Sequence, residues 1–398
     1  MPVLIASVAM TLCLGATYSW SLFVDPLKSS LGIGQGTAQI PFTLFFVAFP
    51  VTTLFAGRAI AQFGMRGAAC LGGLLLGGGW ILAGFGALGF PFVAIGIGII
   101  GGVGVGLAYL VPIAAGVQWF PRHKGLVTGV AIAGFGAGSA LVAFAGGRML
   151  SVHGATPFAV FRLLGVVYLA VVVLASTQMR LPPGATPAPR KPWNLPREFR
   201  ETGFSALYFA MFTGLMAGFL VIANIKQLST GAQHAQGVAA VALFAFTNAA
   251  GRIVWGAASD RIRLDAVLSA NLVLQALVLL ASPVLLRGDN GLGALALLAG
   301  FNYGGVLVLY AAAVANRWGA ENVAGLYGQL FSANVPASFA PVAAGYVFDQ
   351  TASFALPVAV AAATALAGAW VVRKALSAPH AQIGRATSEL QSRQSISY

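Results

Sequence analysis

The sequence consists largely of apolar runs, each long enough to cross a lipid bilayer as a helix. A hydrocarbon core about 30 Å thick takes roughly 20 apolar residues in helical conformation. Backbone groups in lipid must be satisfied within their own segment, so we expect helices rather than the short alternating strands of a membrane barrel. About twelve such runs can be placed, near positions 3–24, 36–57, 67–88, 91–118, 124–148, 157–178, 203–227, 236–258, 265–287, 291–315, 322–347 and 352–372.

Composition agrees with lipid as the solvent of this chain. Of the 398 residues, 58% are hydrophobic and only 8% are charged. A soluble domain usually carries about 25% charged residues. We therefore predict an all-α integral membrane protein with twelve transmembrane helices.

Lysines and arginines are distributed unevenly between the two sides of this predicted topology. If the first helix runs outward, sixteen of the 22 basic residues fall in inside loops, four fall outside, and Arg162 and Arg252 fall within helices. This positive-inside asymmetry predicts that the N- and C-termini are both cytoplasmic. It also explains most of the formal charge of +13 without a nucleic-acid partner.

A polar, proline-rich stretch divides the predicted helices into two groups of six. We expect an N-terminal six-helix bundle over 1–178, a cytoplasmic linker over 179–202, a C-terminal six-helix bundle over 203–374 and a cytoplasmic tail over 375–398. A motif recurs in the two halves, as GRAIAQFGMR at 57–66 and GAASDRIR at 256–263. Two related halves can hold a ligand near the bilayer midplane at their interface.

The sequence contains none of the residue patterns that would indicate an enzyme. The four histidines, His123, His153, His234 and His380, are far apart, and no pair has the spacing of metal ligands. The nine acidic residues all fall at predicted helix ends, in loops or in the tail, which excludes a carboxylate dyad within the membrane. GIGIIG at 96–101 matches a dinucleotide fingerprint, but it lies inside an apolar run and indicates helix packing instead. We predict no catalytic residue, metal or cofactor.

Arg252 is the polar residue that points most directly to a function. It lies eight residues before Asp260, so on the order of 12 Å from the polar end of its helix. A cation at such depth costs about 2.5–3.5 kcal/mol on insertion scales, and such residues normally mark ion or substrate pathways. Backbone carbonyls or an acid at a helix end are one way to stabilise it. Because no acid lies within a predicted helix, we favour a substrate carboxylate, which a guanidinium binds in bidentate fashion.

Other polar and aromatic residues at similar predicted depth are candidates for the same site. Each polar one can donate a hydrogen bond to a carboxylate, and Phe331 would supply an apolar wall. Contacts between helices, or a buried tyrosine with a local partner, are the alternative explanation for each. The candidates beside Arg252 are Tyr18, Tyr109, Asn248, Asn302, Tyr303, Phe331 and Asn334.

Several of these residues lie in segments that resemble a known family. The segments are GATYSWSLFVDPLKSSLG at 15–32, GVGVGLAYLVP at 102–112, QWFPRHKGLVTGVAIAGFGAG at 118–138 and NAAGRIVWGAASDRI at 248–262. They are similar to the oxalate:formate antiporter branch of the major facilitator superfamily, which is related to the monocarboxylate transporters. The resemblance implies an alternating-access carrier of small carboxylates that usually acts as a monomer, here in the bacterial cytoplasmic (inner) membrane. By position, Arg252 resembles the substrate-clamping arginine of that branch, and Tyr18, Tyr109, Tyr303 and Phe331 match cavity residues.

Two departures from the family pattern bear on the substrate and on coupling. Where the oxalate exchanger has a lysine in the eleventh helix, this chain has Asn334. Losing one opposite charge at about 4 Å removes on the order of 4 kcal/mol of attraction at an effective dielectric constant of 20. We therefore predict a monocarboxylate such as lactate, pyruvate or formate. Where proton-coupled animal carriers have an aspartate, this chain has Asn248, so a coupled proton would travel with the substrate; we favour symport over exchange.

The repeated loop motif is expected to act in gating. Gly256, Asp260 and Arg261 fall where facilitator transporters carry G-x-x-x-D-[RK]. The carboxylate of Asp260 can interact with the positive N-terminal end of a neighbouring helix dipole, and the basic residues hold the cytoplasmic side closed. The first copy supplies Gly57, Arg58, Gly64 and Arg66, but Ala61 stands at its acidic position, so that latch is incomplete.

Three other functions remain open at this point. An oxalate/formate-type anion exchanger would use the same site without proton coupling. An efflux carrier for another organic anion would need a roomy aromatic cavity. A membrane sensor would need an output domain, and the tail after residue 375 is too short to be one.

Overall fold

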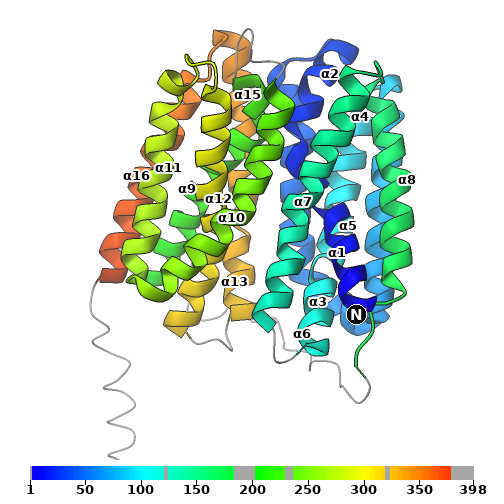
Figure 1. Cartoon of the computed structure of the whole chain (residues 1–398), viewed down its shortest axis with the longest axis horizontal. Coiled ribbons are helices and arrows are strands. Elements are labelled where there is room, and N and C mark those ends of the chain that lie inside the picture. Colours follow the sequence, from blue (N-terminus) through cyan, green and yellow to red (C-terminus); the bar gives the residue numbers. More distant parts are fainter. Residues whose placement is uncertain (1, 121–123, 183–201, 229–235, 319–322, 378–398) are drawn as a thin grey trace, which may run out of the picture.

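A computed structural model of the chain describes residues 2–120, 124–182, 202–228, 236–318 and 323–377. Within these ranges every regular element is helical. Figure 1 shows long helices that run in roughly the same direction, with α1 to α8 gathered on one side and α9 to α16 on the other. This is the helical class that the apolar runs predicted.

The first half of the chain forms the elements from α1 to α8. Trp20, Phe23, Trp80 and Phe161 form an aromatic core here, with ring centroids 4.9–6.4 Å apart. Its helices are α1 (Pro2–Leu14), η1 (Ala16–Ser19), α2 (Ser21–Leu31), α3 (Gln35–Ala83), η2 (Gly86–Leu88), α4 (Phe90–Val93), η3 (Ala94–Gly101), α5 (Gly102–Ala108), α6 (Leu110–Trp119), α7 (Lys124–Ser151) and α8 (Pro157–Ser176).

The second half of the described chain begins after the polar stretch. Its helices are α9 (Thr202–Leu228), α10 (Gly237–Arg261), α11 (Leu264–Leu285), α12 (Gly291–Trp318), α13 (Val323–Phe331), α14 (Asn334–Ala337), α15 (Phe339–Thr351) and α16 (Ala355–Ser377). The predicted linker and tail lie almost wholly outside the described residues, since 183–201 and 378–398 are not covered.

Two predicted runs are joined in one element, and the runs at 3–24, 91–118 and 322–347 are each divided into several elements. α3 contains 36–57 and most of 67–88, and the chain turns inside it at Gly64, where φ is 72° and ψ is 170°. Only glycine adopts this backbone conformation readily. The run at 322–347 is divided into α13, α14 and α15, with breaks at Ser332–Ala333 and Ser338.

The described part of the chain contains nine helices that are long and apolar enough to cross a membrane. The 49-residue α3 counts as one of them although it contains two predicted runs. GIGIIG lies in the π-helical element η3, flanked by α4 and α5 rather than by a strand. The packing interpretation of that motif is therefore confirmed, whereas the total of twelve crossings stays a prediction.

Several pairs of elements form the contacts between the two halves, and three of them are the following. α3 packs against α15, α7 against α10, and α2 against α9. Residues of α10, α12 and α13 lie opposite residues of η1, α3 and α7 and Tyr109, which lies between α5 and α6. The candidate site lies in this region between the halves.

Candidate functional site

A cavity of about 200 Å³ lies between the two halves. Both halves contribute to its lining, which contains one cationic side chain, three tyrosines, three phenylalanines and three aliphatic residues. The lining residues are Tyr18, Phe49, Tyr109 and Phe135 from the first half and Arg252, Leu307, Val308, Ala311, Tyr327 and Phe331 from the second.

Arg252 reaches this cavity from the middle of α10. The helix continues to Arg261, so the guanidinium lies on the order of 14 Å along the axis from that end. α10 crosses α12 closely at this level, because Gly304 lies against the backbone of Asn248 and Arg252. The phenol groups of Tyr18, Tyr109 and Tyr327 line the same cavity as Arg252. A guanidinium among phenols is a favourable environment for a carboxylate.

Aromatic rings from both halves form the walls of the cavity. The rings of Tyr109 and Phe331 are nearly parallel, 9° apart in orientation with centroids 6.2 Å apart. Phe49 meets both rings edge-on, at 5.2 Å from Tyr109 and 5.6 Å from Phe331. Phe135 packs against Tyr109 at 5.2 Å. A movement that separates the halves would therefore separate the cavity walls.

Four of the eight residues predicted from the sequence line the cavity, and the other four are buried outside its lining. Arg252, Tyr18, Tyr109 and Phe331 belong to the lining. Tyr303 is fully buried, and its ring meets that of Tyr18 edge-on at 6.3 Å.

The three predicted asparagines are all buried and do not line the cavity in this conformation. The carbonyl oxygen of Asn302 accepts a hydrogen bond from Asn271 Nδ2 at 2.9 Å. Asn334 Nδ2 donates to the carbonyl oxygen of Phe331 at 2.6 Å and so bridges the break between α13 and α14. Asn248 lies on α10 with only 2% of its surface exposed. Direct contact of these amides with a substrate remains a prediction.

Six lining residues were not identified from the sequence. Five of them, Phe49, Phe135, Leu307, Val308 and Ala311, are apolar residues within apolar runs and carry no signal of their own. Tyr327 could have been found, because it is a polar residue within a predicted helix, like Tyr303. Its hydroxyl donates to the carbonyl oxygen of Leu307 at 2.8 Å, which ties α13 to α12.

The predicted gating residues lie at the surface, away from the cavity. Gly57, Arg58, Gly64 and Arg66 are exposed on α3, and Arg58 lies over the ring of Phe55 at 5.6 Å. Asp260 and Arg261 are exposed in the last turn of α10, and Gly256 is half-buried against Val308. Their role in gating stays a prediction.

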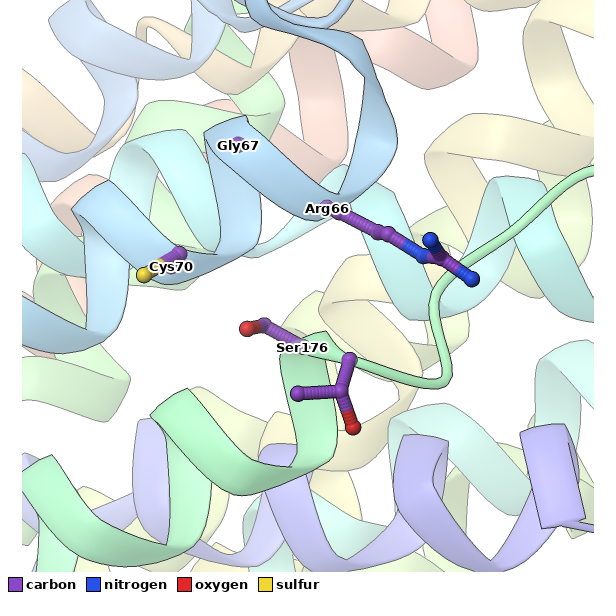
Figure 2. A pocket seen from close by; sticks show the side chains of 5 residues that line it. Arg66, Gly67, Cys70 and Ser176 are labelled. Carbon is purple, nitrogen blue, oxygen red and sulfur yellow. The ribbon is translucent and has the colours of Figure 1, made fainter.

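A second, larger cleft of about 370 Å³ lies between α3 and the end of α8. Figure 2 shows Arg66, Gly67 and Cys70 along α3, with Ser176 opposite them. The hydroxyls of Ser176 and Thr177 already donate to the carbonyl oxygens of Val173 and Leu174, at 2.6 and 2.7 Å. This cleft shares no residue with the central cavity, and both of its hydroxyl groups are already hydrogen-bonded to carbonyl oxygens of α8, so the central cavity is the better candidate.

Comparison with known proteins agrees with this architecture. The sequence matches the Major Facilitator Superfamily over residues 5–334. The chain therefore belongs to the Major Facilitator Superfamily of membrane transporters.

Individual relatives are distant. An uncharacterized MFS-type transporter, YhjX of Escherichia coli, is 27% identical over 339 residues, which are 82% of this chain and 83% of the relative. The oxalate:formate antiporter of Oxalobacter formigenes is 27% identical over 343 residues, which are 84% of this chain and 81% of the relative. The crystal structure of a D-xylose-proton symporter has a TM-score of 0.70 at 14% identity, covering 94% of this chain and 97% of that one, and it supports the fold alone.

Proposed function

We propose that this chain is an alternating-access transporter of small monocarboxylates such as lactate, pyruvate and formate, and that Arg252 binds the substrate carboxylate. The observation that carries the proposal is the position of the guanidinium. It lines a small cavity between the two halves, together with three tyrosines and three phenylalanines. In a transporter built from two related halves, this interface is where substrate binds.

Charge and size favour a small monoanion. Among the residues that the structure describes, Arg252 is the one cationic side chain in the cavity lining, and its charge matches that of one carboxylate. A cavity of about 200 Å³ is smaller than the roughly 300–1,000 Å³ of typical small-molecule pockets, which favours a small acid over a bulky one. Oxalate/formate exchange is the second candidate, because the oxalate:formate antiporter is among the relatives.

The membrane arrangement forms part of the proposal. We infer twelve transmembrane helices in two six-helix bundles, over 1–178 and 203–374, with both termini in the cytoplasm of a bacterium and the chain acting as a monomer in the inner membrane. The break at Gly64 inside α3 supports counting that element as two crossings. A site with a single positive charge suits net uptake or export of the acid together with a proton, and that proton would travel with the substrate.

Replacement of Arg252 by lysine tests the proposed carboxylate contact. Lysine keeps the charge but cannot form the bidentate pair, so we expect kcat/KM for labelled lactate in proteoliposomes to fall by about 100-fold. Arg162→Lys is the matched control, because Arg162 is exposed on α8 and lies outside the cavity lining. Normal transport by Arg252→Lys would contradict the proposal.

A further inference from the structure

The side of the cavity that α12 provides is apolar and contains one small residue. Leu307, Val308 and Ala311 line the cavity, and Val308 and Ala311 lie three residues apart on one helix face. α12 lies against the backbone of Arg252 at Gly304. From Gly304 to Ala311 the helix rises about 10 Å, so this apolar wall extends along α12 away from the point where Gly304 meets the Arg252 backbone.

We propose that Ala311 sets the longest apolar tail that the site accepts, an inference that rests on the proposed function. When the carboxylate is bound to Arg252, the rest of the acid lies against Leu307, Val308 and Ala311. Ala311 is the smallest of the three, and its single methyl group leaves the far part of the cavity open. The neighbouring wall is held in place, because the Tyr327 hydroxyl donates to the Leu307 carbonyl oxygen.

The experiment measures the chain-length preference of Ala311 variants in proteoliposomes. Unlabelled formate, acetate, propionate, butyrate and hexanoate compete with labelled lactate for uptake by wild type, Ala311→Leu and Ala311→Gly. Ala312→Leu is the control, because Ala312 is the next residue on α12, about 100° around the helix and outside the cavity lining. When a hydrophobic pocket has no room for one extra methylene, kcat/KM for the longer substrate is typically about tenfold or more below that for the shorter one.

The outcomes separate this inference from the proposed function. We expect Ala311→Leu to weaken competition by butyrate relative to acetate by about tenfold, Ala311→Gly to strengthen competition by hexanoate, and Ala312→Leu to behave as wild type. An unchanged chain-length profile in both Ala311 variants overturns the role of Ala311 and leaves the proposed function standing. If wild type takes up no labelled lactate, both are overturned.

The end of the molecule that carries α2 and α15 is closed by hydrogen bonds between the halves. This end lies opposite the start of α1 in Figure 1. Gln35 and Gln39 of α3 are fully buried, and their Nε2 atoms both donate to Asn224 Oδ1 of α9 at 2.9 Å. One helical turn further along α3, Thr43 Oγ1 donates to the carbonyl oxygen of Ser338 at 2.6 Å.

Asp349 adds a charged contact to this closure. Its Oδ1 accepts from the backbone N–H of Gln35 at 2.7 Å, and its Oδ2 accepts from the N–H of Gly36 at 2.9 Å. Gln35 is the first residue of α3, so a carboxylate of α15 caps the N-terminus of a helix in the other half. The two backbones approach so closely here that a Cβ atom on Gly345 would lie 2.6 Å from Gly36 Cα.

The structure assigns Asp349 as a latch that holds this end of the two halves together. Gln35 is 14 residues before Phe49, so the latch lies about 21 Å along α3 from the cavity lining. A substrate can enter or leave past α2 and α15 only after the N–H groups of α3 separate from Asp349. The latch therefore favours the conformation that is closed at this end, independently of which substrate is carried.

Spin labels at Ser30→Cys and Ala355→Cys report the opening of this end. Both positions are exposed, one on α2 and one at the start of α16, and Cys13 and Cys70 are replaced by alanine. Distance distributions are measured by pulsed EPR in nanodiscs. Asp349→Asn keeps one acceptor oxygen, Asp349→Ala keeps none, and Asn224→Ala removes the acceptor that Gln35 and Gln39 share. Asp289→Asn is the control, because Asp289 is an exposed acid in the turn between α11 and α12.

We expect a population at longer distance that increases from the parent to Asp349→Asn and again to Asp349→Ala. Loss of a capping carboxylate corresponds to roughly a tenfold change in the ratio of open to closed molecules. Asn224→Ala should change the ratio in the same direction, and Asp289→Asn should leave it unchanged. Distributions that match the parent in Asp349→Ala and Asn224→Ala overturn the latch.

Discussion

Arg252 and the residues around it show what a single side chain contributes in an apolar chain. A guanidinium or a phenol within a run of leucine, valine and alanine is conspicuous because it is costly there. For this reason Arg252, Tyr18 and Tyr109 could be predicted as site residues, and the structure brings them into one cavity. Phe49, Val308 and Ala311 could not be predicted, because an apolar residue that faces the cavity has the same sequence signal as one that faces lipid.

Asn334→Lys tests whether charge at the site selects between monocarboxylates and oxalate. Asn334 is buried one turn after Phe331, so a lysine here would extend toward the cavity or force the break between α13 and α14 to rearrange. We expect the ratio of kcat/KM for oxalate to that for lactate to rise by about tenfold or more in proteoliposomes, since a second cation favours the dianion. A wild-type protein that already prefers oxalate would contradict the monocarboxylate prediction.

Tyr327→Phe separates the hydroxyl of a lining residue from its ring. The variant leaves the Leu307 carbonyl oxygen without its side-chain donor, so we expect a loss of stability of about 1 kcal/mol and a KM for lactate raised a few-fold. Thermal unfolding in detergent and uptake assays measure the two effects. Tyr310→Phe is the control: its buried hydroxyl has no hydrogen-bond partner among the described residues, so the variant should be as stable as wild type or slightly more stable.

At the scale of a helix, α3 makes many of the contacts that position the two halves against each other. Gln35, Gln39, Phe46 and Phe49 recur at intervals of three, four or seven residues and so lie along one face, which contacts the second half at each level. The apolar length of this segment could be predicted, and so could the interruption between its two runs. The break within 322–347 could not be located, because Ser332 and Ala333 carry no signal that separates them from a continuous helix.

The kink at Gly64 is predicted to depend on glycine. An alanine at φ 72° and ψ 170° is strained, so Gly64→Ala should lower stability by about 1–3 kcal/mol although nothing lies near the added methyl group. Gly57→Ala is the matched control on the same helix, because Gly57 has helical geometry and open space, and alanine should raise stability by about 0.5–1 kcal/mol. Thermal unfolding of both variants in detergent gives the comparison. Equal changes in thermal stability in the two variants would contradict the prediction that the kink depends on glycine.

At the scale of the whole molecule, the two halves are joined by contacts whose partners lie far apart in the sequence. Apolar length predicts helices, and the polar stretch predicts the division into halves, because both signals are local. The closure between α3 and α15 joins Gln35 to Asp349, 314 residues away, and no local pattern reports such a pair. Each partner, taken alone, resembles an ordinary polar residue at the end of a helix.

If the halves are separate bundles, a chain cut within 183–201 should still assemble. The ring of Phe46 lies 4.4 Å from that of Phe219, and the amides of Gln35 and Gln39 are bonded to Asn224, so the surfaces recognise each other through packing and hydrogen bonds rather than through the connection. We expect fragments 1–182 and 202–398, expressed together, to co-purify in equal amounts from a tag on one of them. Asp349→Ala combined with Asn224→Ala should reduce the co-purified fraction, because it removes acceptors that only the other half satisfies. Two fragments that each reach the membrane but do not associate would show that the boundary at 179–202 does not divide the protein into bundles.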